Sequence, residues 1–277
     1  MGRIRLRPGT ARRNTSPVDP RPPIIDPDVA PRDAIHVALT WLAEIYEGAT
    51  VIRSKQALRW TRGTAQLELH FQSSTYSRRE IGAWAHLRVQ VLDPGFGRWR
   101  ARNPNLTWRT GPLVHSSGTL PPSVVLYGDG AGSRRLDDLP AFIGTDVLPL
   151  LETFASPARL ASDYDLGAMS VFSCIEWSAY KDDIDAARLL LTRHVDGAHP
   201  ALRARLDQAR AAGLPAPGTP IANDIDWWGP TLERLGILAP GEPLPGTAGP
   251  DVAIRNESSR IAAILSEFGH VVDVQAD

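Results

Sequence analysis

Two stretches of alternating apolar and polar residues within residues 66–92 constrain the fold of this chain more than any other feature. A period of two residues is typical of half-buried β-strands. Because a short polar segment separates the stretches, they predict a β-hairpin with one apolar and one polar face. The apolar positions are Leu67, Leu69 and Phe71 in the first stretch and Leu87, Val89 and Val91 in the second.

Further elements are predicted on both sides of this hairpin. Apolar residues at three- and four-residue spacing predict a helix from Pro31 that ends before Gly48 and packs on the sheet. Short strands are predicted at residues 50–53 and 57–61, and a turn at Arg62 and Gly63 would place Arg59 opposite Gln66. Beyond residue 135 the periodicity predicts helices at residues 145–154, 169–180, 182–195, 200–212, 231–235 and 252–268.

These elements define an α+β protein. We expect an antiparallel β-meander of three to five strands, packed by the N-terminal helix and followed by a helical C-terminal half. The predicted organisation is a disordered Pro- and Arg-rich tail at residues 1–30, an α+β domain at 31–165, and a helical region at 166–277 packed on the sheet domain. Linkers are predicted near residues 213–222 and 239–250.

Composition restricts the function classes. The 30 Lys and Arg residues balance 31 Asp and Glu residues, so no strong field favours nucleic acid, and we expect none as a partner. No uninterrupted apolar run of about 18 residues predicts a membrane span, and the basic N-terminus precedes no secretory-type apolar run. The single cysteine, Cys174, lies in an apolar run and is expected to be a buried, inert thiol. A cytoplasmic protein is the expectation.

The polar face of the hairpin is the best candidate site. If the hairpin is centred near Arg78, His70 lies opposite His86 and Glu68 lies opposite Arg88, with Arg59 one strand away. One interpretation is a solvated face with a cross-strand ion pair, available to a protein partner. The alternative is a metal-binding or catalytic site, because two imidazoles and a carboxylate can bind a metal or act as acid and base.

A second candidate combines acidic and aromatic residues. Asp224 and Asp226 precede or flank Trp227 and Trp228 between the two predicted linkers. Tryptophans are frequent among interface hot spots, so these two are candidate binding residues for a partner. The alternative is a clasp that folds onto the body of the protein.

No other motif supports catalysis or a cofactor. The segment from Gly128 to Gly132 follows a predicted strand, but its glycine spacing is neither that of a dinucleotide fingerprint nor that of a P-loop. The serine pairs lack the Gly-x-Ser-x-Gly motif of esterases. The main interpretation therefore includes no catalytic residue, cofactor or metal.

The order of the elements resembles a bacterial family of small α+β domains of unknown function. The likeness covers residues 32–195 and includes the pattern Leu-x-Leu-x-Phe-x-Ser-Ser from Leu67, and Val-Leu-Pro-Leu-Leu-x-x-Phe-Ala-Ser-Pro from Val147. Some of these domains resemble immunity or interaction modules encoded among toxin genes. The resemblance implies a binding role and no catalytic residues.

Two functional hypotheses follow. The first is a non-enzymatic interaction or immunity-like module that binds a protein through the sheet face. The second is a metal-dependent hydrolase that uses His70 and His86, with Glu68 as ligand or base.

Overall fold

The protein is described by a computed structural model that covers residues 21–107, 110–130, 132–163, 171–214 and 224–247. The predicted tail lies mostly outside the described residues, and the predicted helix at 252–268 lies entirely outside them. In the described ranges, no helix is both long enough and apolar enough to cross a bilayer.

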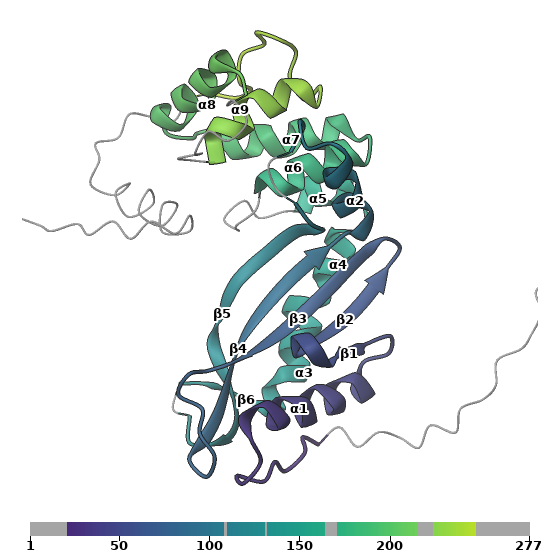
Figure 1. Cartoon of the computed structure of the whole chain (residues 1–277), viewed down its shortest axis with the longest axis vertical. Coiled ribbons are helices and arrows are strands. Elements are labelled where there is room, and N and C mark those ends of the chain that lie inside the picture. The colour runs from purple at the N-terminus through teal and green to yellow at the C-terminus, as the bar shows by residue number, and fades with distance from the viewer. Residues whose placement is uncertain (1–20, 108–109, 131, 164–170, 215–223, 248–277) are drawn as a thin grey trace, which may run out of the picture.

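A six-stranded sheet forms the centre of the fold, with its strands in sequence order (Figure 1). The first five strands pair in antiparallel fashion, and the two-residue sixth strand pairs in parallel with the fifth. The α+β class and the antiparallel meander are therefore confirmed. The strands are β1 (Thr50–Ile52), β2 (Ala57–Arg62), β3 (Ala65–Ser73), β4 (Gly82–Leu92), β5 (Leu113–Gly128) and β6 (Arg134–Arg135).

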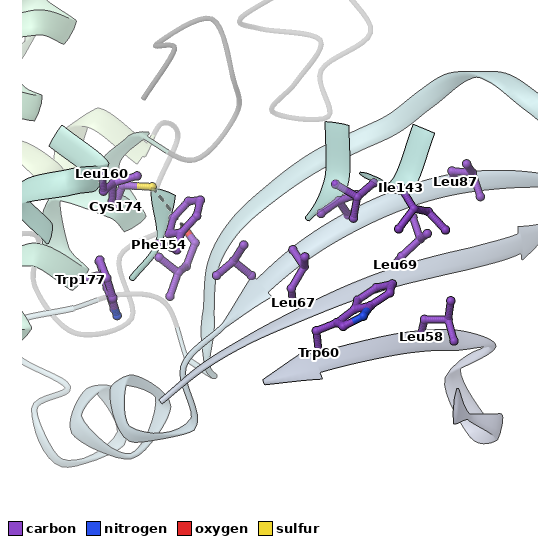
Figure 2. Packing of buried hydrophobic residues seen from close by; sticks show 14 of the residues in the cluster. Leu58, Trp60, Leu67, Leu69, Leu87, Ile143, Phe154, Leu160, Cys174 and Trp177 are labelled. Atoms are coloured by element: carbon purple, nitrogen blue, oxygen red, sulfur yellow. Dashed lines mark hydrogen bonds between the residues drawn. The ribbon is translucent and has the colours of Figure 1, made fainter. Parts of the chain in front are cut away.

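Helices cover one face of this sheet. The N-terminal helix α1 contacts the first five strands, and α4 contacts β3 (Figure 1). The apolar side chains predicted for the hairpin are all buried in this core, and Figure 2 shows Leu67, Leu69 and Leu87 on the side of the sheet that Ile143 covers. The covering elements are α1 (Pro31–Ile45), α3 (Leu139–Phe142), the π-helical turn η3 (Ile143–Val147) and α4 (Pro149–Thr153).

The turn between β2 and β3 falls one residue later than predicted. Arg62 pairs with Ala65, so Gly63 and Thr64 form the two-residue loop. Gly63 has a φ of 59°, a left-handed conformation that glycine adopts without the steric cost of a Cβ atom. The shift moves Arg59 from the predicted Gln66 to a position opposite Glu68.

Helix α2 (Pro94–Arg102) lies between β4 and β5, where the sequence pattern predicts no helix. Asp93 caps it by accepting hydrogen bonds from the amides of Gly95 and Phe96, at 2.8 and 3.2 Å. Proline at the first helical position is compatible with this start, because its missing N–H has no partner within the helix. Asp93 followed by Pro94 is therefore a helix-start signal in the sequence. The overlapping pair Pro94 and Gly95 is also typical of a turn, so the two signals compete.

A group of helices lies beyond the end of the sheet where β5 begins (Figure 1). The bounds of α8 coincide with the predicted helix at 200–212. The residues after α9 are fixed to this group up to Thr247, because Arg203 donates to the carbonyl oxygens of Leu244, Pro245 and Gly246. The helices are α5 (Pro157–Asp163), α6 (Val171–Tyr180), α7 (Ile184–Val195), α8 (Pro200–Ala212) and α9 (Asp224–Arg234).

A buried ion pair joins α2 to α6. Arg100 Nη2 lies 2.7 Å from Glu176 Oε2, and both side chains are 1% exposed. Arg100 also donates to the carbonyl oxygen of Leu113, at 2.9 Å, and its guanidinium lies over the ring of Phe96. These contacts connect the start of β5 with both helices, so they fix the helical group against the end of the sheet.

The outer face of the sheet as candidate site

The candidate site lies on the face of the sheet opposite α1 and α4, called the outer face below. Side chains alternate along each strand, so the residues between the buried apolar positions of β2, β3 and β4 point to this face. These outer-face residues are Arg59, Thr61, Gln66, Glu68, His70, Gln72, Trp84, His86, Arg88 and Gln90.

The pairing of the two histidines differs from the prediction. His70 lies opposite Arg88, His86 lies opposite Gln72, and Glu68 lies opposite Gln90. These pairs are centred on Arg79, so the hairpin is centred one residue later than predicted. Parity is unchanged by this shift, so every residue keeps its predicted face while its partner changes.

Glu68 is the centre of the site. Its side chain is fully buried although it points to the outer face, because three neighbouring side chains cover it. Arg59 donates its Nε–H to Glu68 Oε1 at 3.0 Å, Lys55 Nζ lies 3.2 Å from both carboxylate oxygens, and His70 Nε2 lies 2.9 Å from Oε2. The carboxylate thus holds three nitrogen-bearing side chains around itself.

The pKa of Glu68 reflects these contacts. Burial alone would raise it, but the close contact with His70 and the hydrogen bonds from Arg59 and Lys55, together with the charge of Lys55, outweigh burial and lower the pKa to about 2. Glu68 is therefore ionised throughout the neutral range. A carboxyl group with so low a pKa is a weak proton acceptor, and an efficient general base has a pKa near the working pH.

The site carries an excess of positive charge. Lys55, Arg59 and Arg88 are cationic, and Glu68 is the one acidic residue among the outer-face residues, all of which the structure describes. Lys55 is 46% exposed and Arg59 is 26% exposed, so both remain in contact with solvent while they bind Glu68. Arg88 donates its Nε–H to Ser116 Oγ on β5, at 3.0 Å, which fixes its guanidinium on the outer face.

Sequence reasoning missed Lys55, which lies in the 3-10 turn η1 (Arg53–Lys55) between β1 and β2. No strand parity applies to a residue in a turn. Gln56, which follows it, has a φ of 50°, an uncommon conformation for a residue other than glycine. This turn directs the Lys55 ammonium group onto Glu68, 13 residues further along the chain.

The two tryptophans are not part of the outer face. Trp227 and Trp228 belong to α9, in the helical group beyond the end of the sheet (Figure 1). Trp228 is 1% exposed and stacks on Phe172, with ring centroids 4.7 Å apart, so its side chain lies inside the fold. Trp227 is only partly exposed.

The arrangement does not assemble a metal-binding set. Within the ranges that the structure describes, no three or more His, Cys, Asp and Glu side chains are placed to hold a metal ion. His70 and His86 occupy diagonal rather than opposite positions on β3 and β4. Glu68, the third member of the proposed set, already accepts hydrogen bonds from Arg59 and Lys55.

Outside the outer face, His194 on α7 is a titratable group with a shifted pKa. It packs edge-on against Phe172, with ring centroids 5.1 Å apart, and burial lowers its pKa to about 4. The folded state therefore prefers the neutral imidazole, whereas the unfolded chain takes up a proton near pH 6.5.

We expect His194 to make the protein less stable as the pH falls from 6.5 to 4, by at most about 3 kcal/mol, because only the unfolded state binds the proton there. Urea denaturation at pH 7 and at pH 4.5 measures this loss. Replacing His194 by Gln should reduce the difference between the two pH values. An equal difference in the variant would contradict the assignment.

Comparison of the chain with protein-family models, with curated proteins and with solved structures finds no match.

Proposed function

We propose that this protein is a non-enzymatic, cytoplasmic interaction module that binds an acidic surface of a partner protein through its outer face. The observation that carries the proposal is the excess of cationic side chains around the buried carboxylate of Glu68. The resemblance to domains that include immunity-like modules agrees with a binding role.

Three properties of the outer face support this function. Its cations are held in place by Glu68 and Ser116, so little side-chain entropy is lost when a partner binds. Its charge complements an acidic surface, which increases the association rate and disfavours basic partners. The carboxylate of Glu68 has a pKa of about 2, which favours a structural role over acid–base catalysis.

Site-specific photo-crosslinking in cells of the source organism tests the proposal. A benzophenone amino acid at Gln72, which is exposed on the outer face, should give one discrete protein adduct. The same amino acid at Glu44, exposed on α1, should not give that adduct. Equal adducts from both positions would overturn the proposal, because they would indicate unspecific contact.

The charge requirement is tested in the same experiment. Replacing Lys55 and Arg88 by Gln should reduce the adduct from Gln72 roughly tenfold, since two cations facing an acidic surface are lost. The matched control is Arg32→Gln, an exposed arginine on α1, which should leave the yield unchanged. An adduct that is insensitive to the double variant would contradict an electrostatic interface.

A further inference from the structure

The tip of the central hairpin, residues 74–81, exposes two large apolar side chains. Tyr76 is 80% exposed and Ile81 is 62% exposed. In the part of the chain that the structure describes, the other exposed large apolar residues are isolated from each other along the sequence, at Ile24, Val37 and Leu189. Single exposed apolar residues are ordinary on protein surfaces, and these two are distinguished by lying on one short loop.

The tip is held in one conformation by hydrogen bonds. Ser77 Oγ accepts the amide hydrogen of Trp84 and donates to its carbonyl oxygen, both at 3.0 Å. The amide of Glu80 donates to the carbonyl oxygen of Pro27 at 3.0 Å, and Arg78 pairs with Gly82. Tyr76 and Ile81 are therefore presented by an ordered backbone, which lowers the entropy lost on binding.

Glu80 has a φ of 64°, which is unfavourable for a residue with a Cβ atom. The bond to Pro27 and the Arg78–Gly82 pair hold it there. Backbone conformations of this kind persist where the surrounding structure imposes them, and they occur often at binding sites.

Two arginines lie between the two apolar residues in the sequence of the tip. Arg78 and Arg79 are exposed, and neither forms an ion pair with another described residue. The tip adjoins the outer face, because Ser77 bonds to Trp84, which is two positions from His86 on that face. The tip carries Arg78 and Arg79 against the exposed Glu80, so its net charge is also positive.

We propose that the hairpin tip is the apolar anchor of the partner interface, with Tyr76 and Ile81 inserted into an apolar pocket that has an acidic rim on the partner protein. This inference rests on the proposed function of the outer face. Tyrosine and arginine are enriched among residues that dominate binding energy, and such residues occupy desolvated pockets surrounded by polar groups.

The test uses the protein that crosslinks to Gln72, purified and titrated calorimetrically with the full chain. The double variant Tyr76→Ser/Ile81→Ser should bind at least about 30-fold more weakly, as expected for the loss of a hot spot. Its melting temperature should not change, because both side chains are exposed. The matched control Leu189→Ser, 46% exposed on α7, should bind like the wild type.

A second crosslinker at Arg79 separates the two proposals. Adducts with the same protein from Gln72 and Arg79 are expected. An adduct from Gln72 alone, or a tip variant that binds within about threefold of the wild type, would overturn the anchor and leave the outer face in place. No adduct from either position would overturn both proposals, as would an adduct removed by nuclease, because the partner would then be a nucleic acid. An adduct from Arg79 alone would overturn the shared interface.

Discussion

Replacing Glu176 by Gln should lower the free energy of unfolding by about 3 to 5 kcal/mol, because the change leaves the charge of Arg100 buried without its counterion. Both side chains are 1% exposed, so water cannot replace the lost partner without opening the fold. Urea denaturation at pH 7 measures the loss. Since Arg100 connects α2 with α6 and β5, the same variant should loosen the helical group against the sheet.

A double variant shows whether the loss of stability comes from the buried charge that remains when one partner of the ion pair is removed. Arg100→Met combined with Glu176→Met should be less destabilised than the sum of the two single variants, because no buried charge remains. The free energy of unfolding of the double variant should still be below that of the wild type, because the carbonyl oxygens of Gly111 and Leu113 lose the hydrogen bonds from Arg100. The exposed pair between Arg159 and Glu152 is the control, and its loss should cost less than about 1 kcal/mol. An equal cost for both pairs would contradict the buried charge.

This ion pair shows why part of the fold could not be predicted from the sequence. Arg100 and Glu176 are 76 residues apart, and each lies in a segment whose own pattern gives no reason for a buried charge. The two meet only because α6 packs on β5 and α2 packs on α6. Tertiary contacts of this kind have no local signal, unlike helix starts such as Asp93-Pro94.

Strand parity was predictable and strand register was not. Alternation assigned Glu68, His70, His86 and Arg88 to one face, and the structure places all four there. Their cross-strand partners depend on the exact centre of the hairpin. When the centre moves by one residue, each residue's partner moves by two positions, so every pair changes. Because side chains alternate with a period of two, no residue changes face. The predicted partners were wrong for this reason. Glu80 in the tip has a positive φ, which is uncommon for glutamate, so no residue preference indicated this conformation.

Glu68 carries the second large effect. Replacing Glu68 by Gln should cost about 3 kcal/mol of stability at pH 7, since folding lowers the pKa of this carboxyl group from its ordinary value of 4.5 to about 2. The sign follows from linkage, because a lowered carboxyl pKa adds stability that is complete above pH 4.5. This stability is lost as the pH falls towards 2. The urea midpoints of wild type and variant should therefore approach each other as the pH falls below 4.5, and they should converge only as the pH nears 2.

The matched control is Glu80→Gln, a change of an exposed glutamate on the same hairpin. It should alter neither the stability at pH 7 nor its dependence on pH. A Glu68→Gln variant that keeps the stability of the wild type at pH 7 would contradict the role of the carboxylate as the fixed centre of the cluster.

Glu68→Gln also tests whether partner binding depends on the net charge of the outer face or on the orientation of its cations. Glu68→Gln makes the outer face more positive, so a purely electrostatic interface would bind an acidic partner more tightly. If the position of the cations matters, the variant should bind more weakly, because Arg59 and Lys55 lose the carboxylate that orients them. We expect weaker binding with a steeper dependence on salt, since mobile and exposed cations are screened more effectively than fixed ones.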